Sequence, residues 1–158
     1  PLCLVGSEMC IRDRLEFDFE KVKEKSKDNP LYYVQYCYAR ICSVFKNADE
    51  KIENDLTEVE KNYEFNDEEI KIINKISEWP KCVEVSSQKL EPHRIPIYLY
   101  QLSALFHSYW NMGKDNESMR FLDKSKKLNK NKAVLLNSVL KTIGTGMKIL
   151  DVETPETM

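Results

Sequence analysis

Apolar residues in this chain recur at steps of three and four residues, and this spacing constrains the fold more than any other feature. Such steps place side chains on one face of an α-helix, whereas a strand requires strict alternation. The clearest series lies near the C-terminus and consists of Leu136, Val139, Leu140, Ile143, Met147 and Leu150. No segment carries a convincing strand pattern. The sequence therefore predicts an all-α helical bundle.

Capping signals divide the chain into separate helices. Asn29 followed by Pro30 predicts the start of a helix that runs to about Lys46. Asn66 with Glu69 three residues later resembles a capping box, and the helix it opens is expected to stop at Trp79–Pro80. Ile52, Leu56, Val59 and Tyr63 form an amphipathic pattern that predicts an acidic helix at 52–63. Further helices are expected at 80–89, at about 92–113 and at about 136–150. A lysine-rich connection is expected at 114–132.

The glycines indicate structural roles and not phosphate binding. Gly113 follows the longest helical pattern and is expected to cap that helix at its C-terminus. The segment "GTGMK" at Gly144–Lys148 lies inside a helical pattern, where each glycine costs up to about 1 kcal/mol relative to alanine, so close helix packing is favoured. Phosphate-binding loops, dinucleotide-binding glycine patterns and nucleophile elbows are absent from the sequence. We expect no catalytic site in this chain itself.

Charge and hydropathy predict no membrane-spanning segment but leave nucleic acid open as a partner. The chain has 158 residues, 32% of them charged, and its apolar runs fall far short of the roughly 18 residues that span a bilayer. The formal net charge is −2, yet acids dominate 49–84 and bases dominate 114–148. A polyanion would therefore have to meet a local basic face.

The first fourteen residues, "PLCLVGSEMCIRDR", look foreign to the rest of the chain. They resemble the translation of a sequencing adaptor, so we expect the native domain to span 15–158. Without them, Cys37 and Cys42 stand about 140° apart on a helix and cannot share a metal ion. Neither histidine has metal-ligand spacing, so no metal site is expected. Unpaired, core-type cysteines are typical of the reducing cytoplasm.

A stripe of polar aromatics raises a question that periodicity alone does not answer. Tyr33, Tyr36 and Arg40 share one face of the helix at 30–46. From spacing alone, half-buried tyrosines with hydroxyls at the rim of the core are favoured. His107 in "LFHSYW" could act as a general base, but it has no visible partner triad, so a satisfied histidine in a helix interface is favoured.

Three blocks in order carry a family resemblance: "DNPLYYVQYCYARICSV", "LEPHRIPIYLYQLSALFHSYWN" and "TIGTGMKILDVETPETM". Together they closely resemble the C-terminal anticodon-binding, DALR-type bundle of arginyl-tRNA synthetases, which are class I enzymes. The resemblance implies that the chain recognises the anticodon loop of tRNA(Arg) for an upstream catalytic domain of the same chain. That domain would use ATP with Mg²⁺, while this fragment would hold no cofactor and bind neither DNA nor a membrane.

The same resemblance implies which residues meet the RNA. Unpaired bases stack on aromatic rings and are contacted by arginine, and the family's matching positions indicate Tyr33, Tyr36, Arg40 and the terminal Met158. Trp110 would lie either near the RNA or beneath the C-terminal segment. Tyr32 and Tyr38 are expected to remain core-type residues. Two alternatives stay open: the anticodon-binding bundle of another class I synthetase, and a helical protein-interaction module without RNA binding.

Overall fold

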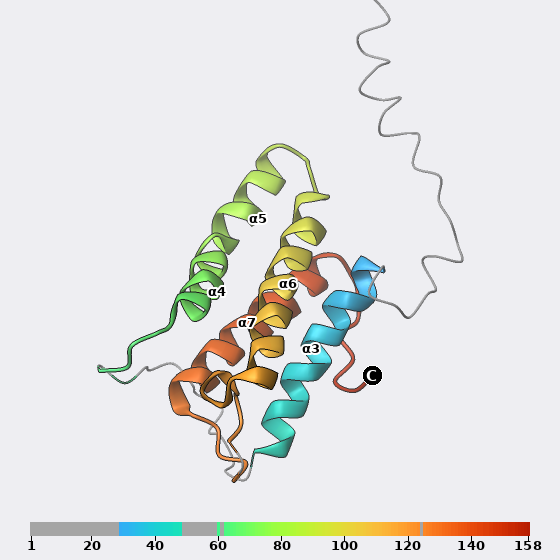
Figure 1. Cartoon of the computed structure of the whole chain (residues 1–158). Helices are drawn as coiled ribbons and strands as arrows, with labels where there is room; N and C mark the ends of the chain where they lie inside the picture. Colours follow the sequence, from blue (N-terminus) through green and yellow to red (C-terminus); the bar gives the residue numbers. More distant parts are fainter. Residues whose placement is uncertain (1–28, 49–59, 61, 124) are drawn as a thin grey trace, which may run out of the picture.

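The structure is a computed structural model that describes residues 29–48, 60, 62–123 and 125–158. These residues contain five α-helices and one short 3-10 helix (Figure 1). They are α3 (Pro30–Asn47), α4 (Asp67–Ser77), α5 (Trp79–Gln88), α6 (Arg94–Asp115), η1 (Glu117–Met119) and α7 (Lys130–Ile149). Within these ranges the only β-type pairing is an isolated bridge between Leu122 and Leu128. The all-α prediction is confirmed. The predicted boundary at residue 15 and most of the predicted helix at 52–63 fall outside the described residues.

Local capping signals set the starts of α3 and α4 as the sequence predicted, whereas α7 begins at Lys130, inside the expected connection at 114–132, where Asn129 caps it. The side chain of Asn29 accepts a hydrogen bond from the Leu31 amide at 3.1 Å, and Pro30 occupies the first turn of α3. At α4, Asn66 Oδ1 accepts from the Glu69 amide at 2.9 Å while a Glu69 carboxylate oxygen accepts from the Asn66 amide at 3.1 Å. This reciprocal capping box satisfies two amides that a helix N-terminus otherwise leaves without partners.

Gly113 does not end its helix, and this prediction was wrong. Helix α6 continues through Asp115 and is capped at Asn116, whose amide donates to the Met112 carbonyl. Gly113 instead lies against Arg120, whose Nε donates to the Gly113 carbonyl at 2.8 Å. A Cβ at this position would lie 3.4 Å from Arg120 Cγ. The glycine therefore serves the close packing of the following segment and not the helix end.

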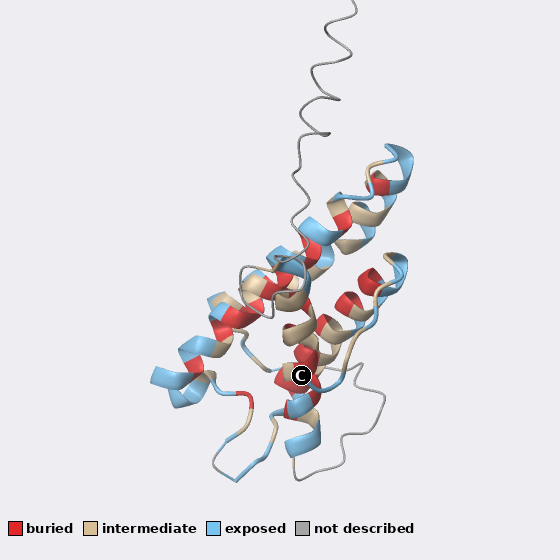
Figure 2. Ribbon diagram, turned by 90° about the vertical axis from the view of Figure 1, so that its right-hand side faces the viewer, coloured by how far each residue is buried: buried red, intermediate tan, exposed pale blue. Residues whose placement is uncertain are grey.

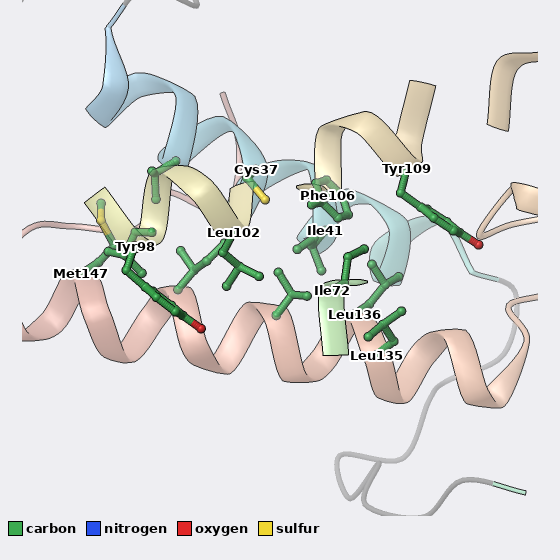
Figure 3. Packing of buried hydrophobic residues seen from close by; sticks show 14 of the residues in the cluster. Cys37, Ile41, Ile72, Tyr98, Leu102, Phe106, Tyr109, Leu135, Leu136 and Met147 are labelled. Atoms are coloured by element: carbon green, nitrogen blue, oxygen red, sulfur yellow. The ribbon is translucent and has the colours of Figure 1, made fainter. Parts of the chain in front are cut away.

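Helix α6 is the centre of the bundle. It contacts α3, α4, α5 and α7, and Figure 1 shows α3 on one side of it and the consecutive helices α4 and α5 on the other. Buried positions concentrate where the helices face one another (Figure 2). Leu102, Phe106 and Tyr109 of α6 are fully buried together with Ile41 and Leu136, and Figure 3 shows this packing above α7. Each such side chain contributes roughly 1.5–3 kcal/mol through burial.

The glycines of α7 differ in how tightly they are packed. A Cβ on Gly146 would lie 2.6 Å from Leu99 Cδ2 of α6, which is closer than carbon atoms can approach. A Cβ on Gly144 would lie 3.6 Å from Tyr38 Cε2, an ordinary van der Waals distance. The packing interpretation of "GTGMK" is confirmed at Gly146, because only a residue without a side chain lets α6 and α7 approach so closely.

Within the described residues, every helix is too short or too polar to span a bilayer.

Candidate functional site

Helices α3 and α6 bring four of the five predicted site residues into one cluster. Tyr33, Tyr36 and Arg40 lie on one face of α3, each partly buried, and that face contacts Trp110 and His107 of α6. We call these five residues the aromatic–arginine cluster. Steps of three and four residues place the α3 members in line along the helix. Their contacts with His107 and Trp110 of α6 depend on how the two helices pack. The sequence alone did not predict these contacts.

Arg40 is the centre of this cluster. Its guanidinium carbon lies 4.4 Å from the centroid of the Tyr36 ring and 4.7 Å from that of Trp110. One terminal nitrogen donates a hydrogen bond to the Tyr36 hydroxyl, and the other donates to His107 Nδ1 at 3.3 Å. A planar guanidinium can stack on rings and donate in its own plane at once, which an ammonium group cannot do. These contacts hold the charge of Arg40 in one place.

His107 is a structural member of the cluster, as its sequence context predicted. It is 6% exposed, and its ring centroid lies 4.5 Å from that of Tyr33 and 5.7 Å from that of Tyr36. Arginine can only donate, so Nδ1 must accept from Arg40, and Nε2 then carries the proton and faces the Tyr33 carbonyl at 3.5 Å. The imidazole therefore holds Arg40 and faces the Tyr33 carbonyl, and it is not positioned as a general base.

Trp110 links the cluster to the core. In addition to Arg40, its ring contacts Phe106 and Phe121, with centroid separations of 5.9 Å in both cases. The sequence left two placements open for Trp110, near the RNA or beneath the C-terminal segment. Its ring contacts Arg40 and the core rings, and a place near the RNA stays a prediction. The indole is a half-buried support on which Arg40 rests.

The C-terminal tail that precedes Met158 lies on a different side of α3 from the cluster. The C-terminal tail is fixed to this helix by Gln35, whose side-chain amide donates to the Glu153 carbonyl at 3.0 Å, and by an ion pair of 2.9 Å between Lys46 and Glu156. At roughly 100° per residue, Gln35 is turned about 100° from Tyr36 around the helix. Met158 itself is 52% exposed. Its predicted place beside the RNA stays a prediction.

The remaining tyrosines of α3 behave differently from each other. Tyr38 packs against the hydrophobic core, as predicted. Tyr32 instead lies parallel to Tyr36, with ring planes 5° apart and centroids 6.3 Å apart, at the edge of the aromatic–arginine cluster. Burial raises the pKa of Tyr33, and the neighbouring Tyr100 hydroxyl raises it further. Tyr33 therefore stays neutral and contributes an uncharged ring to the cluster.

The two helices that carry the cluster contain almost no acid. Their sequences include Arg40, Lys46, Arg94 and Lys114 but a single carboxylate, Asp115, at the far end of α6. By contrast, α4 opens with Asp67, Glu68 and Glu69. In a chain with 26 acidic residues, the two helices themselves therefore add little negative charge that would repel an anionic partner.

Comparisons with known proteins show which family the chain belongs to. Residues 34–158 match the family model of the DALR anticodon binding domain. The chain belongs to this family. Its relatives include the arginine–tRNA ligase of Pelagibacter ubique, 58% identical over 144 residues, and that of Bartonella bacilliformis, 41% identical over 150 residues, each match covering 91% of this chain. The chain spans about a quarter of the length of these relatives (25% and 26%).

A solved structure of similar fold belongs to a candidate arginyl-tRNA synthetase from Campylobacter jejuni. It superposes with a TM-score of 0.70 at 23% sequence identity, and the match covers 90% of this chain and 29% of that one. The helical arrangement of the DALR domain is thus shared with a crystal structure.

A second group of polar side chains in the DALR domain is centred on Glu69. The sequence predicted the capping role of Glu69 but not its hydrogen bonds to tyrosines. Glu69 is 1% exposed and accepts hydrogen bonds from the hydroxyls of Tyr109 at 2.9 Å and Tyr63 at 3.3 Å. Burial together with Glu69 raises the pKa of Tyr63 to about 12 and also raises that of Tyr109. Burial lowers the pKa of the nearby Lys132, whose Nζ donates to the Arg120 carbonyl at 3.0 Å. This network ties α4 to α6.

Proposed function

We propose that this DALR domain binds the anticodon loop of an arginine-accepting tRNA as part of an arginine–tRNA ligase. The proposal rests mainly on the aromatic–arginine cluster, which lies on a face whose helices carry a single acid. Membership of the DALR family and the names of the relatives support the same partner. We place the protein in the cytoplasm, in keeping with the free Cys37, Cys42 and Cys82.

The chemistry of the cluster suits a single-stranded loop. Splayed bases stack on aromatic faces without much regard to sequence, and a fixed arginine adds contacts to base edges or phosphates. Tyr36 and Arg40 are already stacked on one another, and Trp110 supports the guanidinium from the core. The loop would therefore meet a preorganised charge, which lowers the entropic cost of binding.

Catalysis would belong to a separate domain of the ligase. ATP and Mg²⁺ would bind there, because the sequence of this chain lacks a phosphate-binding glycine loop. Among the described residues, no group of His, Cys, Asp and Glu side chains is arranged to hold a metal ion. The DALR domain would contribute recognition and would leave the chemical step to its catalytic partner.

Truncating the cluster should weaken tRNA binding and reduce its dependence on the anticodon. Tyr36→Ala removes a stacking ring and should lower affinity by about 5- to 150-fold, equivalent to roughly 1–3 kcal/mol per base. Arg40→Ala should lower it as well and flatten the dependence of affinity on salt. The measurement is the dissociation constant of the 158-residue chain for an arginine-accepting tRNA and for the same tRNA with its anticodon replaced.

Matched variants separate this effect from damage to the fold. Tyr38→Phe keeps the ring of a core-packed tyrosine and should bind normally, and Tyr36→Phe should keep stacking while losing only the hydroxyl bond to Arg40. Each variant's helicity and melting temperature are recorded alongside. Deleting Met158 tests whether the chain end takes part. Folded Tyr36 and Arg40 variants with unchanged affinity and unchanged anticodon preference would refute the proposal.

The chain alone should attach no arginine to tRNA. Activation of arginine requires an ATP site, and the phosphate-binding patterns that would provide one are missing from the sequence. Incubating the purified chain with arginine, ATP, Mg²⁺ and tRNA should give no charged product above background. Arginine-dependent charging by this chain would contradict the division of labour proposed above.

A further inference from the structure

An exposed aromatic residue adjoins the cluster on α6. Tyr100 is 41% exposed, and its ring centroid lies 5.2 Å from that of Tyr33. One turn earlier on the same helix, Ile97 is 53% exposed. Both side chains belong to the helix that otherwise forms the centre of the core. A large ring held on one side by a neighbouring ring and open to solvent elsewhere is a surface on which a further planar group can stack.

Ring contacts run without interruption from Tyr100 into the cluster. Tyr100 contacts Tyr33, Tyr33 contacts His107, and His107 contacts both Tyr36 and Arg40. The two ends of this row differ. At one end Trp110 is backed by Phe106 and Phe121 of the core, whereas at the other end Tyr100 faces solvent. On α6, a ligand can therefore extend this row at Tyr100.

We propose that Tyr100, with Ile97 beside it, forms a further stacking position for an unpaired base of the same tRNA loop. This inference rests on the proposed function and adds to it a base that neighbours those met by the aromatic–arginine cluster. A nucleic acid is favoured over a protein partner because α3 and α6 carry a single acid between them and present Arg40 beside the row. Stacking on a tyrosine tolerates any base. Tyr100 therefore contributes affinity and not discrimination among anticodons.

The test compares two tRNAs and three variants of the 158-residue chain. Tyr100→Ala should weaken binding about 5-fold or more, by the same factor for the native tRNA and for the tRNA with a replaced anticodon. Tyr100→Phe should bind as the unchanged chain does. Met112→Ala is the matched control, because Met112 is an exposed residue of α6 that is turned about 120° from Tyr100 and should have no effect. The salt dependence of Tyr100→Ala should be unchanged, since no phosphate contact is lost.

The outcomes separate this inference from the function on which it rests. If the unchanged chain binds tRNA and a folded Tyr100→Ala variant binds equally well, the stacking position is refuted while the proposed function stands. If Tyr100→Ala loses anticodon preference, Tyr100 takes part in base discrimination and the inference as stated is wrong. If the unchanged chain does not bind tRNA, the proposed function fails first. Should Tyr100→Ala unfold, Tyr100→Leu keeps apolar bulk without a ring and is expected to show the same loss.

Discussion

Replacing Glu69 by alanine is expected to lower the free energy of unfolding by about 3 kcal/mol. The carboxylate completes the capping box at Asn66, which is worth about 1 kcal/mol, and it accepts from the buried hydroxyl of Tyr109. A buried hydroxyl left without a partner costs about 1–3 kcal/mol. At 2–4 °C per kcal/mol, the melting temperature should fall by about 6–12 °C. Urea unfolding followed by circular dichroism measures the change.

Two further variants assign this loss to the network. Glu69→Gln keeps the shape and one acceptor oxygen and should be less damaging than alanine. Tyr109→Phe removes the donor together with its need for a partner, so Glu69→Ala should cost less in that background, which a double-mutant cycle reveals. Equal stability of the unchanged chain and Glu69→Ala would mean that the carboxylate does not tie α4 to α6.

Alanine substitutions at the two glycines of α7 are expected to have opposite signs. Gly146→Ala would place a Cβ 2.6 Å from Leu99 Cδ2, and Leu99 is buried in the core, where close packing opposes its movement. Overpacking of this kind typically costs about 1–3 kcal/mol, which exceeds the gain of up to about 1 kcal/mol in helix propensity. Gly144→Ala meets only an ordinary contact with Tyr38 and should stabilise the domain by up to about 1 kcal/mol.

The pair is its own control, because the same chemical change is made two residues apart on the same helix. Urea midpoints at a constant slope measure both effects. Shortening the opposing side chain with Leu99→Ala should remove most of the penalty at Gly146. If both substitutions stabilise the domain, α6 and α7 do not approach as closely as the structure has them.

Sequence reasoning succeeded where the signal was local. The caps at Asn29 and Asn66 follow from hydrogen bonds between residues two or three positions apart, so the chain around them was sufficient to predict them. Gly113 shows the limit of this approach. Its pattern is typical of a helix end, but the decisive contact is with Arg120, and nothing in the neighbouring sequence indicates that packing.

The candidate site was predictable only in part for the same reason. Spacing placed Tyr33, Tyr36 and Arg40 on one face, and the family resemblance gave that face a role. Tyr100 and His107 reach these residues only because α6 packs against α3. Arg40 and His107, for example, are 67 residues apart in the sequence. Glu69 was recognised as a capping residue, yet its two tyrosine donors come from other segments.

The placement of the two tryptophans gives the molecule a built-in optical probe. Trp110 supports Arg40 in the cluster, whereas Trp79 of α5 packs against Tyr98, with ring centroids 5.1 Å apart. Fluorescence from Trp110 therefore reports on the polarity and stacking around Arg40, and fluorescence from Trp79 reports on the contact between α5 and α6. A Trp79→Phe variant leaves one indole, whose emission reads out events at the α3–α6 face without any attached dye.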